Sequence, residues 1–183
     1  MGYEPALDKA WSELKSLSKE SSLSVKFLSD EYSIDVNKRE ILSLACNIKA
    51  KDFYSILILH YLIQELKGIP RLTSEWASFQ EFDGGQGYYP AFRKRVIEPI
   101  IRKYGSNPKS LLESVEKFSA KAVQFGDSGI VIEAFKGIPI LITLWAGDSE
   151  FGPEANMLFD KSITKIFPTE DIVVLGGIVA SLV

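Results

Sequence analysis

The segment Phe53–Leu66 constrains the fold of this chain more than any other, because it is apolar on nearly every face of a helix. Asp52 precedes it as a possible helix N-cap, and Gly68 with Pro70 marks the expected end. A helix that is apolar all round has to be covered on all sides. We therefore expect this helix to form the buried centre of the domain.

Strand and helix patterns surround this segment. Leu7, Trp11, Leu14 and Leu17 form one apolar stripe, which predicts an amphipathic helix over residues 5–19. Apolar and polar residues alternate over residues 24–27 and again over residues 32–37, on either side of a short polar turn. This alternation predicts a β-hairpin, with a possible third strand near residues 41–44.

The second half of the chain repeats this mixture. A short strand is predicted around residues 75–81, followed by the glycine-rich loop Asp83–Gly87 and a helix that begins near Pro90 and is kinked by Pro99. Asn107 caps a further predicted helix. Two strands over residues 129–135 and 138–145 form a tight antiparallel pair, and a short strand at residues 157–159 precedes a helix from about residue 170.

Strands in clusters, separated by runs of helices, are typical of an α+β domain. We expect a single domain over residues 1–183, with a mostly antiparallel sheet packed against several helices, including the buried central one. In the C-terminal helix Gly176 and Ala180 lie one turn apart, and they would let a neighbouring backbone approach closely.

Composition excludes several classes of function. The 183 residues carry 21 Lys and Arg against 24 Asp and Glu, a net charge of −3, which argues against a nucleic-acid-binding protein. The N-terminus lacks the pattern of a secretory signal. The longest apolar run, residues 172–183, is about half the roughly 20 residues that a membrane span needs. We expect a cytoplasmic protein that does not enter membranes.

The chain contains one cysteine and one histidine. Cys46 cannot form a disulfide within the chain or a thiolate metal cage, and we interpret it as a small buried residue. His60 lies in the most apolar helix, where a hydrogen-bonded core histidine is the simplest interpretation.

The loop Asp83–Gly87 is a candidate anion site. Free backbone N–H groups at a helix start favour negative charge, and Arg93, Lys94 and Arg95 would lie in the first turns. The glycine spacing matches neither the dinucleotide-binding fingerprint nor a P-loop. The alternative is a strand-to-helix turn that needs positive φ angles.

Acidic and aromatic residues provide two further hypotheses. Asp148, Glu150 and Asp160, with Glu154 nearby, could gather at one end of a sheet and bind Mg²⁺ or Ca²⁺, although a solvated acidic turn explains the pattern equally well. Trp76, Trp145 and Phe151 could line a ligand pocket, although strand aromatics usually belong to a core.

Several runs of the sequence resemble the DUF3786 family, a domain of unknown function in bacteria and archaea. They are Leu72–Phe79 leading to Gly84-Gly85, Tyr89–Arg95, Leu144–Phe151 and Leu158–Asp160. The resemblance covers nearly the whole chain and implies no assigned activity. Some relatives join this domain to a cysteine-rich iron–sulfur segment like that of corrinoid proteins, and this chain, with Cys46 alone, lacks that segment. The implied context is anaerobic one-carbon or corrinoid metabolism.

We therefore expect a non-catalytic binding module for a small anionic or cofactor-like ligand or for a partner protein. No cofactor can be named. The residues predicted to bind the ligand are Trp76, Gly84, Gly85, Arg93, Arg95, Trp145, Asp148 and Phe151. One alternative is a metal-dependent hydrolase or transferase that uses Asp148, Glu150 and Asp160. Another is a structural subunit of a homo- or hetero-oligomer.

Overall fold

The computed structural model describes residues 2–183 and confirms an α+β fold with two antiparallel sheets, of three and five strands. Contacts between residues divide the chain into two compact units, which meet in sequence at Arg71 and Leu72. The expectation of one domain over the whole chain stays a prediction.

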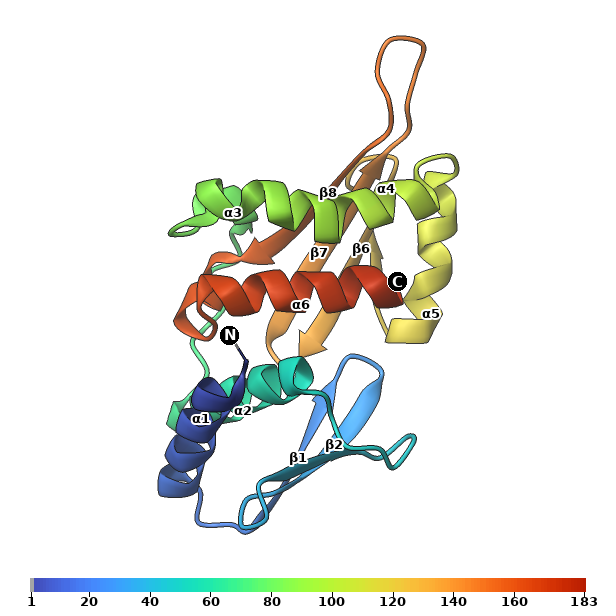
Figure 1. The fold of residues 1–183 in the computed structure, drawn as a ribbon. Coiled ribbons are helices and arrows are strands. Elements are labelled where there is room, and N and C mark those ends of the chain that lie inside the picture. Colours follow the sequence, from blue (N-terminus) through green and yellow to red (C-terminus); the bar gives the residue numbers. More distant parts are fainter. Residues whose placement is uncertain (1) are drawn as a thin grey trace. The chain divides into compact units, whose positions relative to one another are not determined.

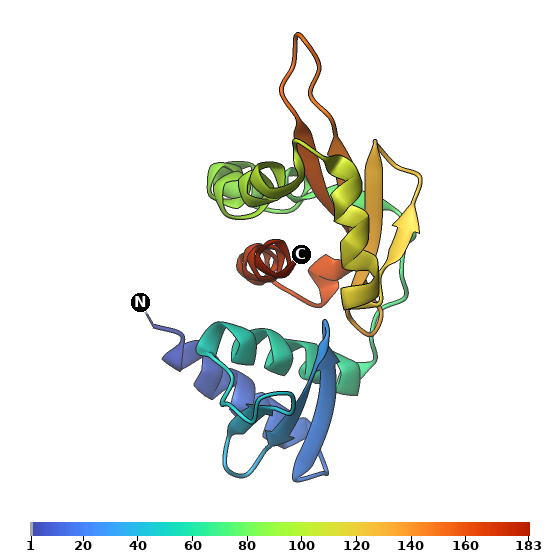
Figure 2. The same cartoon turned by 90° about the vertical axis from the view of Figure 1, so that its right-hand side faces the viewer.

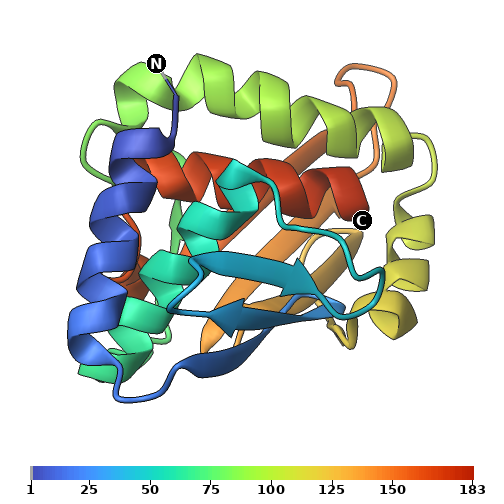
Figure 3. The same ribbon diagram turned by 60° about the horizontal axis from the view of Figure 1, so that its bottom comes forward.

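The first unit contains α1 (Glu4–Leu17), β1 (Ser22–Phe27), β2 (Asp30–Asp35), β3 (Glu40–Ser43) and α2 (Asp52–Lys67). The three strands form a meander in which Val25 pairs with Tyr32 and Ile34 with Ile41, as the alternation predicts. Helix α1 packs against α2 (Figure 3), and Lys67 Nζ bonds Glu13 Oε1 at 2.6 Å between them.

Helix α2 confirms that the apolar segment is helical and buried. Eight of its residues are buried, including Leu57, Ile58 and Leu59, none of which is exposed to solvent. Its N-cap is Lys51, whose side chain makes no capping bond, and Asp52 is the first helical residue. The acidic Asp52 still lies in the first turn, where it complements the helix dipole.

The second unit begins with β4 (Trp76–Ser78) and the short 3₁₀ helix η1 (Phe79–Glu81). A long helical run follows, made of α3 (Gly85–Phe92), the π-helical turn η2 (Arg93–Ile97) and α4 (Glu98–Tyr104). Pro99 has no N–H to donate, and the N–H of Glu98 bonds the Arg93 carbonyl five residues back. The helical run therefore contains a π-helical turn just before Pro99, and the predicted kink stays a prediction.

The remaining elements of this unit complete the sheet and its cover. They are η3 (Pro108–Glu113), α5 (Ser114–Phe118), β5 (Lys121–Val123), β6 (Ser128–Phe135), β7 (Ile138–Trp145), β8 (Glu154–Asp160), η4 (Lys161–Lys165) and α6 (Thr169–Leu182). The strand order is β4-β8-β7-β6-β5, so the short strands β4 and β5 form the two edges. Helices α3, α4 and α6 lie over one face of this sheet (Figures 1 and 2).

Gly176 explains how closely α6 approaches its neighbours. A Cβ atom there would lie 3.2 Å from Phe92 and 3.3 Å from both Met157 and Val96, so only a glycine leaves this packing undisturbed. These neighbours are side chains, so the close approach of a neighbouring backbone stays a prediction. Within residues 2–183, no helix combines the length and the apolarity that crossing a bilayer requires.

Candidate functional site

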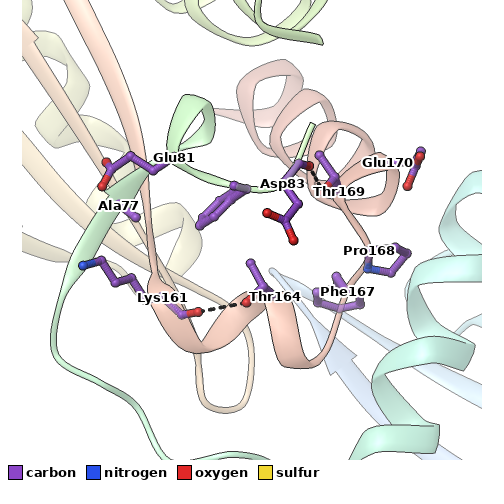
Figure 4. Close-up of a pocket in the computed structure, with 10 residues that line it drawn as sticks. Ala77, Glu81, Asp83, Lys161, Thr164, Phe167, Pro168, Thr169 and Glu170 are labelled. Atoms are coloured by element: carbon purple, nitrogen blue, oxygen red, sulfur yellow. Dashed lines mark hydrogen bonds between the residues drawn. The ribbon is translucent and has the colours of Figure 1, made fainter. Parts of the chain in front are cut away.

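The second unit contains a cleft of about 640 Å³ between two segments that are far apart in the sequence (Figure 4). One wall comes from β4, η1 and the loop after it, and the other from η4 and the start of α6. The lining residues are Ala77, Glu81, Phe82, Asp83, Lys161, Thr164, Phe167, Pro168, Thr169 and Glu170. This volume lies within the range of ~300–1,000 Å³ typical of small-molecule sites.

The cleft has an apolar floor and a polar rim. Ala77 and Phe167 are each 1 % exposed and Phe82 is 7 % exposed, whereas Glu81, Asp83 and Glu170 lie on the surface. Figure 4 shows the Asp83 side chain directed from one wall toward Thr164 on the other. The polar rim therefore supplies most of the surface that a ligand can reach, and the floor adds a small apolar area.

Local hydrogen bonds fix the first wall. The backbone N–H and the hydroxyl of Ser78 donate to Glu81 Oε1 at 2.7 and 3.0 Å, a capping box that begins η1. These bonds, the backbone one first, lower the pKa of Glu81, which therefore carries its charge at neutral pH. The Thr169 hydroxyl donates to the Asp83 carbonyl at 2.8 Å and joins this wall to α6.

The charges of the cleft favour a cation. Lys161, the one basic residue among its lining, donates to Glu75 at 2.8 Å, and this bond and the Glu75 charge raise the pKa of Lys161. Three carboxylates, Glu81, Asp83 and Glu170, line the same cleft. Because Lys161, the lysine among the described lining residues, is already paired, an anion would meet mainly negative charge here.

The glycine loop has a structural role, and the positive φ angle expected of a strand-to-helix turn is part of it. Gly84 has a φ of +73°, and a Cβ atom on Gly85 would lie 2.1 Å from the Phe79 carbonyl oxygen. Gly84 therefore supplies a left-handed turn, and Gly85 permits close contact between backbones.

The expected cluster of cations at this loop is absent, because α3 begins at Gly85 and not near Pro90. Arg93 is eight residues along, about 12 Å from the helix start at 1.5 Å per residue. Arg93 and Arg95 lie exposed in η2, and neither lines the cleft.

The structure does not bring the three predicted metal ligands together. Asp148 and Glu150 lie in the loop between β7 and β8, whereas Asp160 is the last residue of β8. Since Trp145 pairs with Glu154 at the loop end, Asp160 is six residues, or about 20 Å, further along the strand. Among residues 2–183, no group of three or more His, Cys, Asp or Glu residues could hold a metal ion.

Asp160 instead anchors the chain that leads into β4. Its Oδ1 accepts from the Thr73 N–H, the Thr73 hydroxyl and the Ser162 N–H at 2.9–3.0 Å, and its Oδ2 accepts from the Ser74 N–H at 2.8 Å. Burial alone would raise the pKa of Asp160, but hydrogen bonds from Ser162 and Thr73 outweigh it and bring the pKa to about 2.

The aromatic residues predicted to form one pocket lie apart. Trp76 pairs with Asp160 at one end of the sheet, and Trp145 pairs with Glu154 at the other. Trp145 makes an edge-to-face contact with Phe125, with ring centroids 6.5 Å apart. Phe151, at the β7–β8 loop, is 71 % exposed. None of the three lines the cleft, although Trp76 adjoins Ala77, which does.

Cys46 and His60 occupy less buried positions than expected. Cys46 is exposed in a surface turn over residues 44–46, just after β3, and its thiol donates to the Ser43 hydroxyl at 3.2 Å. The interpretation of Cys46 as a buried residue was wrong. His60 is half-buried on α2.

Sequence reasoning missed the residues that line the cleft. One signal was available, because Phe167-Pro168-Thr169-Glu170-Asp171 combines an aromatic residue with the proline and acidic residues of a helix start. The pairing of β4 with β8, which sets the two walls side by side, has no local signal.

Comparison with known proteins gives one match. A family model described as "Domain of unknown function (DUF3786)" matches residues 11–181. No curated protein and no solved structure matches the chain.

Proposed function

Since the chain belongs to the DUF3786 family, whose description assigns no activity, we propose from its geometry that it is a non-catalytic binding module. Its binding site is the cleft between η1 and the start of α6. The single observation that supports this proposal is a cavity of about 640 Å³ with a buried apolar floor and a charged rim.

The charge of the rim specifies the ligand class. Glu81, Asp83 and Glu170 face a single, already paired lysine, so the site favours a ligand with a positive group and an apolar or aromatic body. Phe82, which is 7 % exposed, provides the aromatic surface for that body, because Phe167 is only 1 % exposed. The anionic ligand expected from the sequence is not favoured by these charges.

Two probes of similar size and opposite charge test the proposal. We expect 2-phenylethylammonium to bind in isothermal titration calorimetry and 3-phenylpropionate not to bind. The double variant Asp83→Asn, Glu170→Gln should weaken the ammonium probe by about tenfold, the equivalent of ~1.4 kcal/mol, because it removes two rim charges. Both residues are exposed, so the fold should be retained.

The matched control is Glu150→Gln, which removes an exposed carboxylate from the β7–β8 loop, outside the cleft. This variant should bind the ammonium probe like the unmodified protein. Equal binding of both probes, or equal losses in the control and the double variant, would contradict the assignment of the cleft.

Other expectations from the sequence stay predictions. They are the partner protein, the carboxylate-based enzyme, the structural subunit, the link to anaerobic one-carbon or corrinoid metabolism and the cytoplasmic location.

A further inference from the structure

Two elements of the second unit carry opposite charge at the surface, and neither contributes a described residue to the lining of the cleft. The basic run, residues 93–103 of η2 and α4, contains five basic residues and one acidic residue, Glu98. The acidic arm, residues 146–154, is the β7–β8 loop with the first residue of β8, and it contains three acidic residues and no basic one. Opposite charges on one chain allow two copies to recognise each other.

The basic run presents its charges to solvent on rigid helices. Its five basic residues are all exposed. Four of them form no side-chain hydrogen bond or ion pair with another of residues 2–183, namely Arg93, Lys94, Arg95 and Arg102. The fifth, Lys103, donates to the Val183 carbonyl. Val96 and Ile100 are 0 % and 1 % exposed, so the other side of the run is fixed in the core. Three guanidinium groups and one ammonium group are therefore open to a partner.

The tip of the acidic arm has a fixed shape. Asp148 Oδ1 accepts from the Glu150 and Phe151 N–H groups at 2.8 Å each, and the Asp148 N–H donates to the Phe151 carbonyl at 2.8 Å. Figures 1 and 2 show the arm extending beyond the helices and the other strands of the unit. Glu150 is exposed, and Phe151 beside it is 71 % exposed. An ordered tip that presents a carboxylate and an aromatic ring loses little entropy on binding.

The base of the arm lies beside the basic run. A Cβ atom on Gly105, the residue after α4, would lie 2.8 Å from the Pro153 ring, so the arm packs on the end of this helix. Within residues 2–183, the arm and the run form no ion pair with each other. A two-fold axis beside this junction would place each arm on the basic run of the other copy, so the same contact would form twice.

The charge of the whole chain favours a compact acidic partner. The net charge is −3, so acidic residues outnumber basic ones outside the basic run. A long polyanion such as RNA, or an anionic membrane, would meet this negative charge beyond the run. The acidic arm of a second copy is small and has the required charge. It also adds the Phe151 ring, which can stack on a guanidinium group.

We propose that the acidic arm of one copy binds the basic run of a second copy, so that two copies form a two-fold symmetric dimer. Glu150 and Glu154 pair with arginines of the basic run, and the Phe151 ring lies against a guanidinium group. The interface is small and charged, so the dimer is weak, with a dissociation constant on the order of 10–100 µM. At about 1 µM protein the copies are separate.

Sedimentation velocity of the full chain tests the proposal. Between about 5 and 500 µM protein in ~0.05 M NaCl, we expect a reversible change from monomer to dimer. In ~0.5 M NaCl the dimer should be at least about tenfold weaker, because salt screens exposed charges.

Reversing the charge of the basic run should abolish the dimer. The helix variant is Arg93→Glu, Arg95→Glu, Arg102→Glu, at three exposed positions. We expect it to stay monomeric over the whole concentration range, because its run and its arm are both acidic. Circular dichroism should show it folded, since surface substitutions cost little stability.

The matched control makes the same change of net charge outside both elements. It is Lys19→Glu, Lys121→Glu, Lys165→Glu, also at exposed positions. The control should dimerise within about threefold of the unmodified protein, because distant exposed charges are screened.

Reversing the charge of the arm provides the complementary test. The arm variant is Ser149→Lys, Glu150→Lys, Glu154→Lys, again at exposed positions. Alone it should be monomeric, because its arm and its run are both basic. An equimolar mixture of the arm variant and the helix variant should form a heterodimer, since each arm then meets a run of opposite charge.

Four results would overturn the proposal. They are a monomer at the highest concentration of the unmodified protein, an unchanged dimer in the helix variant, loss of the dimer in the control, and a monomeric mixture of the two folded variants. A monomer that binds polyuridylate through the basic run would instead assign this surface to nucleic acid. The variants change no described residue of the cleft, so its binding of 2-phenylethylammonium tests the other proposal separately.

Discussion

An aspartate lies near each end of β8, one buried at the end of the strand and the other exposed in the loop before it. At its C-terminal end Asp160 is 5 % exposed and accepts four hydrogen bonds, two of them from Thr73. In the loop at its other end, Asp148 is exposed and accepts two backbone bonds, from Glu150 and Phe151, at 2.8 Å each. The sequence presents both as acidic residues beside strands. Burial and long-range donors make one an anchor and the other part of a surface turn.

Replacing each carboxylate by its amide tests this difference most strongly. Asp160→Asn should lower the free energy of unfolding by about 3 kcal/mol, because an amide turns an N–H group toward at least one of the present donors in a buried site. Urea unfolding followed by circular dichroism measures the change. Asp148→Asn, as the control, should cost less than about 1 kcal/mol. Similar losses in the two variants would remove the distinction between the two ends.

The next largest expected effect is a loss of stability in acid. The folded-state pKa of Asp160 is about 2, below its ordinary value of 3.8. A depressed pKa contributes stability above the unfolded-state value, and this contribution is lost as the pH falls from about 4 through 2. At 1.36 kcal/mol per pKa unit the contribution is about 2 kcal/mol. Urea unfolding at a series of pH values should show this loss, and Asp160→Asn should lack this part of the slope. An identical slope in the variant would assign the acid sensitivity to other carboxylates.

The smallest expected effect lies at the loop. Phe151 is 71 % exposed, so Phe151→Ser should change the free energy of unfolding by less than about 0.5 kcal/mol. Thermal and urea unfolding of the two proteins measure the difference. A loss above 1 kcal/mol would show that the ring is packed in solution, and it would weaken the contrast with the buried end of the strand.

Elements with strong local patterns were predictable. The stripe of α1, the alternation of β1 and β2 and the all-round apolar character of α2 each determine structure within one segment. The start of α3 was not predictable from the sequence. Pro90 resembles a first helical residue, but the helix begins at Gly85, where the backbone packs closely against the Phe79 carbonyl. Strand β5 was missed because three residues are too few to show a period.

The candidate site was hardly predictable for a similar reason. Its two walls are more than 75 residues apart in the sequence, and they meet only because β4 pairs with β8. The role of Asp160 likewise depends on Thr73, which is 87 residues away. Local sequence identifies acidic and aromatic residues, but it does not show which of them long-range pairing will bury.

The attachment of β4 also affects how this unit assembles. Joining Thr73 and Ser74 to Asp160 closes a large loop, whose entropy has to be lost before the bonds form. We expect this closure after the rate-limiting barrier, so loss of the anchor should mainly accelerate unfolding and leave the refolding rate almost unchanged. Because Ala77 and Glu81 follow this attachment and line the cleft, the binding site would then be among the last parts of the unit to form and the first to open.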